Sequence, residues 1–377
     1  MSDLANSARS GGGKAGDIEP SRSRALSASG AIERYALVGL LVCIVLFFSV
    51  YPATGDLFRS TANLRYLLAS QAVTAIIALG MVIPLIAGYF DLTVPAIAGL
   101  SAVLVSALLC NYSVSIPLAL VAGVGAGAVV GAINGWLCAV IKLNALITTL
   151  AGYTLIGGLL LAYTKGQQIN SGFPEALGDW TTFQWLGLPN PFWLVVVVAL
   201  IGWYVTTQTP HGRKLIAIGS NENAARLAGI RVNRIVFSAF VLSGVLGGLA
   251  GTLLAIRTGG ADATAGQSFL FPAMAAVFLG QTAFTPGRYN VWGTVVGVFA
   301  VAVAVNGLSL LGAQSWVQPV FNGTALILSV AISTLTARAR QRRAGRALLE
   351  MAGPRDGTDA EVKVDQLLPP KTTVVRG

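Results

Sequence analysis

The chain has 377 residues, of which 54% are hydrophobic and only 11% are charged, and its mean hydropathy is +0.71. A soluble domain usually carries about 25% charged residues, so the composition excludes a soluble domain of useful size. The formal net charge of +10 does not indicate nucleic-acid binding, because the Lys and Arg residues cluster in particular loops and tails, as the positive-inside rule of membrane proteins predicts.

The N-terminal segment is rich in Ser, Gly and Ala and lacks the apolar core of a signal peptide. We therefore expect a disordered cytoplasmic tail at residues 1–34, followed by a transmembrane domain at residues 35–336. From residue 337 the sequence becomes basic and then polar with mixed charge. Residues 337–377 are expected to form a second cytoplasmic tail, disordered beyond about residue 345.

Apolar segments recur along the whole region between the tails. A membrane-spanning helix needs about 20 predominantly apolar residues. The sequence therefore predicts an all-α, polytopic membrane protein with about ten transmembrane helices. We expect these helices at residues 36–52, 66–88, 94–111, 115–140, 145–163, 191–207, 234–256, 268–284, 291–311 and 315–335.

The distribution of Lys and Arg predicts the orientation of these helices. If the N-terminus is cytoplasmic, the segments that follow the fourth, sixth, eighth and tenth spans are cytoplasmic too. These segments contain Lys142, the basic cluster at 213–234, Arg288 and the basic cluster at 338–346, whereas the outer loops contain few positive charges. An even number of spans with both termini in the cytoplasm follows.

Two predicted helices carry glycines spaced three or four positions apart. The fourth span has Gly123, Gly127, Gly131 and Gly135, and the seventh has Gly244, Gly248 and Gly251. This spacing is typical of membrane helices whose backbones pack closely. Close packing is the interpretation we favour; the alternative is that these faces slide during gating.

Residues suited to catalysis or metal binding are nearly absent. The one histidine, His211, lies in a predicted cytoplasmic loop, and the three cysteines, Cys43, Cys110 and Cys138, lie inside apolar segments without metal-ligand spacing. We expect the cysteines to be small buried apolar residues. Because the sequence has no GxxxxGK[ST] phosphate loop, we expect no catalytic residue, metal or cofactor in this chain, and no ATP site of that type.

The predicted cytoplasmic loop at residues 208–233 contains a short helix. Asn221 is a suitable N-cap, Glu222 would lie at the positive end of the helix dipole, and Gly229 is a suitable left-handed stop after the helix-forming residues 224–228. A helix of about two turns is not stable alone in water. It must therefore dock, either on its own protein or in a groove of a cytoplasmic partner.

Asp91 lies between the second and third spans, which only residues 89–93 separate. An ionisable residue so close to two apolar segments must face water, protein or a cavity. It is either a helix cap at the start of the third span, assisted by Thr93, or part of a broken-helix site that lines a solute pathway. The sequence leaves both interpretations open.

Residues Gly219 to Ile230 resemble the coupling loop of ribose-type sugar permeases, the membrane subunits of bacterial ABC importers. The pattern there is roughly Gly-x-Asn-x-x-Ala-Ala-x-x-x-Gly-Ile. The resemblance extends over about residues 60–335, and further motifs in the same order are Leu79-Gly80-Met81, Gly88-x-x-Asp91-Leu92-Thr93-Val94, Asn134-Gly135, Ile147-Thr148-Thr149-Leu150, Phe278-Leu279-Gly280, Trp292-Gly293-Thr294 and Asn306-Gly307-Leu308-x-Leu310-Leu311-Gly312. The sequence departs from the family pattern at Tyr89, Pro95, Leu270-Phe271 and Gln281, which leaves the identity of the sugar open.

The resemblance implies a type II-like ABC importer permease fold in the bacterial inner membrane that moves a monosaccharide into the cytoplasm. It also implies a second permease subunit, identical or different, two cytoplasmic ATPase subunits that bind ATP and magnesium, and an extracytoplasmic sugar-binding protein. On these motifs we place the solute pathway at Asp91, Thr93, Asn134 and Asn306. We place the ATPase-coupling helix at Gly219, Asn221, Glu222, Ala224, Ala225, Arg226 and Gly229.

Three other functions are alternatives to a permease for a monosaccharide. An ABC permease for another solute, such as branched-chain amino acids, would share the general architecture. An ion-coupled secondary transporter usually keeps acidic or His residues near the middle of the membrane, and here Asp91 alone is a candidate. A membrane enzyme finds no supporting set of residues.

Overall fold

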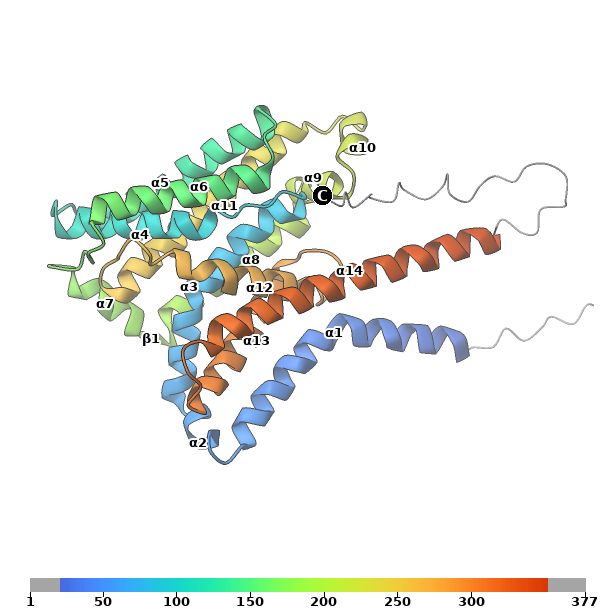
Figure 1. The fold of residues 1–377 in the computed structure, drawn as a ribbon, viewed down its shortest axis with the longest axis horizontal. Coiled ribbons are helices and arrows are strands. Elements are labelled where there is room, and N and C mark those ends of the chain that lie inside the picture. Colours follow the sequence, from blue (N-terminus) through green and yellow to red (C-terminus); the bar gives the residue numbers. More distant parts are fainter. Residues whose placement is uncertain (1–20, 352–377) are drawn as a thin grey trace, which may run out of the picture. The chain divides into compact units, whose positions relative to one another are not determined.

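The computed structural model describes residues 21–351 (Figure 1). The described residues are predominantly helical, with a single two-stranded hairpin among them, which confirms the all-α class. The helices are α1 (Ser21–Val50), α2 (Gly55–Phe58), α3 (Thr61–Ile86), α4 (Val94–Cys110), α5 (Ile116–Gly135), α6 (Ala145–Thr164), α7 (Glu175–Thr182), α8 (Asn190–Trp203), α9 (Pro210–Ser220), α10 (Glu222–Leu227), α11 (Val232–Thr258), α12 (Leu270–Gly280), α13 (Val291–Leu310) and α14 (Val317–Met351).

Short irregular elements connect or extend these helices. Two π-helices, η1 (Trp136–Val140) and η2 (Tyr204–Gln208), prolong α5 and α8, and a 3-10 helix, η3 (Gln267–Phe269), precedes α12. Strands β1 (Gln184–Trp185) and β2 (Leu188–Pro189) form a small antiparallel hairpin in which Trp185 pairs with Leu188.

The chain divides into two units, Met1–Ser333 and Thr334–Gly377. Most of the predicted N-terminal tail, residues 1–20, lies outside the described residues, and α1 begins at Ser21. Of the second unit, the described part is helical up to Met351, and the rest of the predicted C-terminal tail lies outside the described residues. The domain boundaries therefore stay predictions.

Six described helical segments are long and apolar enough to cross a membrane: Thr61–Ile86, Ile116–Val140, Ala145–Thr164, Asn190–Gln208, Val232–Thr258 and Val291–Leu310. Four shorter apolar helical segments of 10–17 residues lie at Arg34–Val50, Val94–Cys110, Gln267–Gly280 and Val317–Ile332. Each of the predicted apolar segments lies on one of these, which confirms a polytopic membrane protein. The exact number of ten spans stays a prediction, because only six of the apolar segments reach 18 residues within the described part of the chain.

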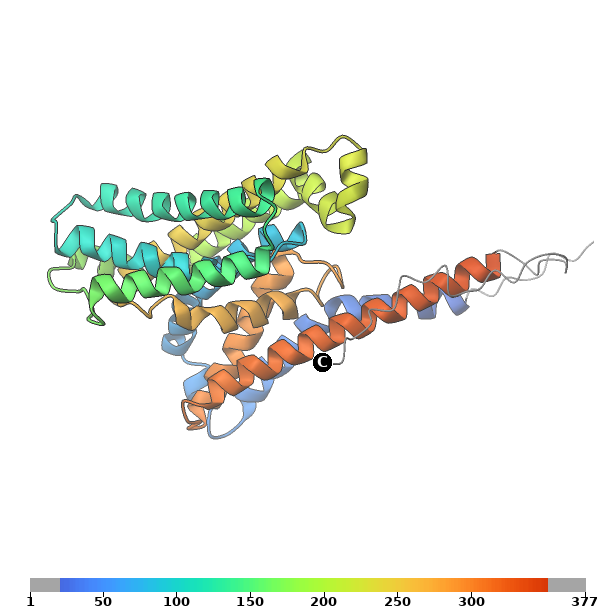
Figure 2. The same cartoon turned by 45° about the horizontal axis from the view of Figure 1, so that its top comes forward.

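Helices α3 and α11 form the centre of the first unit. Of their most apolar stretches, 78% of α3 and 72% of α11 is buried, compared with 22% for α5 and for α6. Helix α11 packs against α3, α4 and α5, and α4 lies between α5 and α6 (Figure 2). The exposed side chains of α5 and α6 are largely apolar, as expected for surfaces that contact lipid or another membrane subunit.

The two glycine-rich helices meet each other, as their spacing predicted. A Cβ atom on Gly127 of α5 would lie 2.3 Å from the carbonyl oxygen of Gly244 on α11, so only glycine permits this backbone contact. Close helix packing is therefore confirmed. Whether the two faces slide during gating stays a prediction.

The cysteines are only partly as predicted. Cys138 is buried and Cys110 is half-buried, but Cys43 on α1 is exposed, so the prediction of a buried thiol is wrong there. The sequence could not show this, because a side chain that faces lipid is as apolar as one in the protein core.

Candidate functional site

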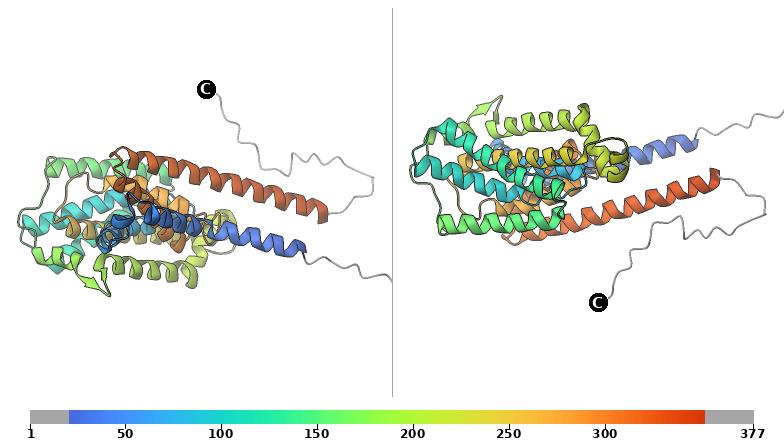
Figure 3. Two further views of the ribbon diagram at one scale, coloured as in Figure 1. Left: turned by 90° about the horizontal axis from the view of Figure 1, so that it is seen from below. Right: turned by 90° about the horizontal axis from the view of Figure 1, so that it is seen from above.

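The predicted cytoplasmic loop contains two helices rather than one. Helix α9, which the sequence analysis did not predict, begins with Pro210 at its first position. The hydroxyl oxygen of Thr209 caps it by accepting a hydrogen bond from the backbone N–H of Gly212 at 3.3 Å. Figure 3 shows α9 and α10 at the end of the helical bundle where α3 ends and α11 begins.

Helix α10 is the short helix predicted from the sequence. The side-chain oxygen of Asn221 accepts a hydrogen bond from the N–H of Ala224 at 3.0 Å, and Gly229 has a left-handed backbone with φ +80°. The predicted cap and stop are therefore confirmed. Ala225 is buried at 3% exposure, whereas Leu227 is 91% exposed. One face of α10 thus docks on this protein, and the other is open.

Gly219 sets how closely α9 approaches the membrane helices. A Cβ atom at this position would lie 2.1 Å from the carbonyl oxygen of Ile86, the last residue of α3. The C-terminal turn of α9 therefore rests directly on the end of α3, and any larger residue would push the two apart.

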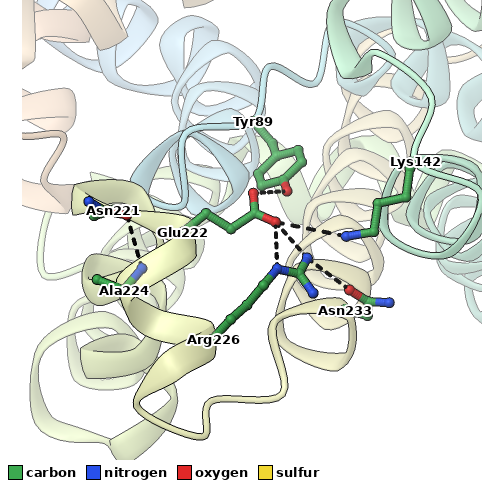
Figure 4. Close-up of polar contacts among 7 residues, drawn as sticks. All are labelled: Tyr89, Lys142, Asn221, Glu222, Ala224, Arg226 and Asn233. Atoms are coloured by element: carbon green, nitrogen blue, oxygen red, sulfur yellow. Dashed lines mark hydrogen bonds and ion pairs between the residues drawn. The ribbon is translucent and has the colours of Figure 1, made fainter. Parts of the chain in front are cut away.

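The Glu222 carboxylate is the centre of a polar cluster between α10 and three other parts of the chain (Figure 4). Its Oε1 atom accepts hydrogen bonds from Nη2 and Nε of Arg226 at 2.6 and 3.2 Å, and the Lys142 ammonium lies 3.8 Å away. Its Oε2 atom accepts a hydrogen bond from the Tyr89 hydroxyl at 2.8 Å. Arg226 also donates to Asn233 at 3.3 Å. The cluster thus joins α10 to the α3–α4 loop, the α5–α6 loop and the start of α11.

The protonation states in this cluster suit these contacts. The hydrogen bond from Arg226, more than any other interaction, lowers the pKa of Glu222, so its carboxylate is charged at neutral pH. Burial and then the hydrogen bond to Glu222 raise the pKa of Tyr89, so its hydroxyl keeps the proton that it donates. Glu222 is 36% exposed, and ion pairs this close to solvent contribute about 0–1 kcal/mol. Their role is to position α10 more than to stabilise the fold.

A second polar network surrounds Asp91, which is 1% exposed. Its Oδ1 atom accepts hydrogen bonds from the backbone N–H of Thr93 at 3.1 Å and from the Thr93 hydroxyl at 2.5 Å. Its Oδ2 atom accepts one from the Ser243 hydroxyl of α11 at 2.8 Å. Asn134 of α5 donates to the Thr93 hydroxyl at 2.8 Å. Three of the four predicted pathway residues therefore lie together.

This network fixes the loop in front of α4 and does not cap the helix. The Asp91 carboxylate binds the N–H of Thr93, the residue that directly precedes α4, and the hydroxyl of Ser243 on α11. No side chain accepts a hydrogen bond from the first turn of α4, so the predicted cap is absent. None of the three predicted residues in the network lines the polar cavity described below, and a role of Asp91, Thr93 and Asn134 in a solute pathway stays a prediction.

The two networks share one loop. Tyr89 and Asp91 are two residues apart in the segment between α3 and α4, where Gly88 takes a left-handed turn with φ +85°. The ring of Tyr89 packs edge-on against Phe240 of α11, with ring centroids 6.3 Å apart. The hydrogen bond from Tyr89 to Glu222 therefore connects α10 to the loop that carries Asp91.

The fourth predicted pathway residue, Asn306, lies elsewhere. Its side-chain amide exchanges two hydrogen bonds with Asn63, each 3.1 Å long. Asn306 lines a cavity of about 400 Å³ between α3, the ends of α11 and α13, and the starts of α12 and α14. Further polar residues that line this cavity are Tyr66, Ser70, Gln71, Thr74, Arg257, Ser268, Ser309, Gln318 and Asn322. Its size is in the range of small-molecule sites.

Several residues of these sites were not singled out by the sequence analysis. Lys142 counted only as a positive-inside charge, and Tyr89 only as a departure from the family pattern. Ser243 and Asn322 carried no signal, because a single hydroxyl or amide in an apolar helix does not reveal its partner. Arg257 was visible as a positive charge on the predicted outer side, where such charges are rare.

Residues 63–330 match the family model described as branched-chain amino acid transport system / permease component. The ribose import permease protein RbsC of Escherichia coli (strain K12) is 34% identical over 307 residues, which cover 80% of this chain and 93% of that protein. The ribose import permease protein RbsC of Bacillus subtilis (strain 168) is 36% identical over 78% of this chain and 90% of that protein. The D-allose transport system permease protein AlsC of E. coli (strain K12) is 31% identical over 81% of this chain and 93% of that protein. No solved structure matches this chain.

Proposed function

Because this chain belongs to the branched-chain amino acid transport system / permease component family, we propose that it is the membrane-spanning subunit of an ABC importer for a monosaccharide. One observation carries the proposal: the similarity to permeases named for ribose and allose covers about four fifths of the chain and nearly the whole of each relative. The names of these three relatives give no support to the alternative in which the transported solute is an amino acid.

The partners proposed for this subunit follow from that function. ATP and magnesium are bound by cytoplasmic ATPase subunits, an extracytoplasmic protein delivers the sugar, and a second permease subunit completes the membrane part. Both termini of this chain lie in the cytoplasm of the proposed complex, which sits in the bacterial inner membrane. The Lys and Arg residues that follow the even-numbered spans support this orientation.

Helix α10 is the proposed contact with the ATPase subunit. Leu227 supports this assignment, because its side chain is 91% exposed on the open face of α10 and is therefore accessible to the groove of a partner. Arg226, by contrast, binds Glu222 and Asn233 within this chain. Its proposed role is to hold α10 in place rather than to bind the ATPase itself.

Energy from ATP reaches the membrane helices through the position of α10. A partner shifts a protein between two states only by binding one of them more tightly. In this proposal, the ATP-bound ATPase prefers one position of α10, and the hydrogen bond from Tyr89 to Glu222 transmits that preference to the α3–α4 loop. Lys142 transmits it to the α5–α6 loop.

The proposal is tested with the purified complex of permease, ATPase and binding protein in proteoliposomes. We expect ATP inside the vesicles, but not ADP, to drive uptake of at least one of labelled ribose, allose and xylose. Leucine uptake serves as the comparison. Uptake of leucine without any sugar would overturn the choice of cargo, and sugar uptake that follows an ion gradient without ATP would overturn the ABC mechanism.

A further inference from the structure

Among the residues that the structure describes, Arg257 is the one charged residue that lines the polar cavity between α3, α11, α12, α13 and α14. It lies in the last turn of α11, and its Nε atom is buried without a hydrogen-bond partner. No Asp or Glu side chain among the described residues forms an ion pair with it. A cation in such a place is costly unless something in the cavity binds it.

Asn322 is a second unsatisfied group in the same cavity. It lies in the second turn of α14, it is 4% exposed, and its Oδ1 atom has no hydrogen-bond partner. Buried polar atoms in proteins are nearly always hydrogen-bonded, so an unpaired one calls for an explanation. The cavity thus presents a buried donor and a buried acceptor, neither with a partner among the described residues.

The remaining polar lining is neutral and can both donate and accept hydrogen bonds. Ser70 and Gln71 come from α3, Asn306 from α13 and Gln318 from α14. Hydroxyls and amides of this kind match the hydroxyl groups of a sugar, each of which is also a donor and an acceptor. A single positive charge without a carboxylate to balance it repels any cationic solute.

We propose that this cavity binds the transported solute, that Arg257 and Asn322 hydrogen-bond to it, and that the lone guanidinium admits neutral or anionic polyhydroxylated molecules while excluding cationic ones. The proposal rests on the proposed function for the identity of the solute. It also rests on the predicted topology, in which the lining residues lie in the outer halves of their helices, so that the cavity opens outward.

The test measures the charge that a small reagent meets in the cavity. Cys43, Cys110 and Cys138 are replaced, and Ser70→Cys places one thiol in the cavity of the assembled complex in proteoliposomes. An anionic and a cationic methanethiosulfonate of similar size are added from outside. Ser113→Cys, at an exposed position between α4 and α5, is the matched control.

At each thiol we compare the labelling rate of the anionic reagent with that of the cationic one. We expect this ratio to be about ten times higher at Ser70→Cys than at Ser113→Cys. Arg257→Gln should remove this preference, and Arg257→Lys should keep it. Ribose, allose or xylose delivered by the binding protein should slow labelling at Ser70→Cys and should leave labelling at Ser113→Cys unchanged. Asn322→Leu should weaken this protection by the sugar.

Equal labelling ratios with and without Arg257→Gln would overturn the electrostatic part of the proposal. A thiol at Ser70→Cys that stays unreactive while the control thiol reacts would overturn the outward-open cavity. If the wild-type complex takes up a sugar that gives no protection, the binding site is wrong and the proposed function stands. If it takes up no sugar at all, the proposed function fails, and the labelling ratios still report on the charge of the cavity.

Discussion

The hydroxyl of Tyr89, in the loop between α3 and α4, donates a hydrogen bond of 2.8 Å to the carboxylate of Glu222 at the first position of α10. The two residues are 133 positions apart in the sequence, and their contact links the proposed ATPase-binding helix to the loop that carries Asp91. Tyr89 is also a position at which this chain departs from the expected family pattern.

Tyr89→Phe should weaken the coupling of ATP hydrolysis to transport. The substitution removes one hydrogen bond, which costs about 0.5–1.5 kcal/mol, and leaves the ring in its place against Phe240. We expect the number of ATP molecules hydrolysed per sugar transported to rise, while the thermal stability stays close to that of the wild type. Tyr112→Phe, at an exposed tyrosine between α4 and α5, is the control. An unchanged ratio would show that this hydrogen bond transmits nothing.

A charge swap should reveal whether Arg226 acts inside this chain. Arg226→Glu places two carboxylates one helical turn apart on α10, where they repel, so the ATPase subunit should co-purify in lower yield. Arg226→Lys keeps a positive charge beside Glu222 and should retain most of the yield. Full co-purification of the Arg226→Glu variant would show that this ion pair does not position α10 for the ATPase.

Leu227→Asp should release the ATPase subunit without unfolding the permease. The side chain is 91% exposed, so its replacement removes no contact within this chain. We expect the midpoint of thermal unfolding to stay the same and co-purification of the ATPase to drop severely. Leu186→Asp, at another exposed leucine on the predicted outer side, should leave co-purification intact. Full co-purification of the Leu227→Asp variant would remove α10 from the interface.

The attachment of α10 should weaken in acid. The pKa of Glu222 is lowered below its ordinary value of 4.5, chiefly by the hydrogen bond from Arg226. A carboxyl with a lowered pKa contributes stability that is present above 4.5 and is lost as the pH falls through the pKa of the folded protein. After correction for the intrinsic exchange rate at each pH, amide hydrogen exchange in α10 should therefore report more opening as the pH falls below 4.5. Glu222→Gln should abolish this pH dependence, and a variant that kept it would place the titrating group elsewhere.

Asp91→Leu should destabilise the fold more than it impairs transport by each folded complex. The variant leaves the hydroxyls of Thr93 and Ser243 without their acceptor, and each unsatisfied buried group costs about 1–3 kcal/mol. Asp91→Asn keeps one acceptor oxygen and should be milder. The midpoint of thermal unfolding measures the loss of stability, and the rate of sugar uptake per folded complex measures transport. Normal stability with lost uptake would place Asp91 in the solute pathway instead.

The helices could be predicted from the sequence because their signals are local. Runs of apolar residues marked the membrane helices, and Asn221 and Gly229 marked the ends of α10. The glycine spacing of α5 and α11 predicted close packing as well. Helix α9 escaped detection, because its residues combine charge with moderate helix propensity and its Thr209 cap resembles a turn.

The polar sites could not be predicted, because their partners are far apart in the sequence. Ser243 and Asp91 are 152 positions apart, and nothing near either residue indicates the other. The solute cavity gathers single polar residues from several apolar helices, and each of them alone resembles an isolated hydroxyl or amide. The exposure of Cys43 was missed for a related reason, since apolarity does not distinguish lipid from protein surroundings.

The contact between Gly127 and Gly244 limits how α5 and α11 can move past each other. Their backbones touch, so no side chain can change rotamer to absorb a small shift. The residues that follow Gly127 are Ala128, Val129 and Val130, and any of these Cβ atoms would strike the facing helix if it replaced a glycine. Because glycine recurs every four residues along α5, a shift that again places a glycine of α5 at this contact covers about 6 Å. The backbone contact therefore disfavours small shifts of α5 along α11.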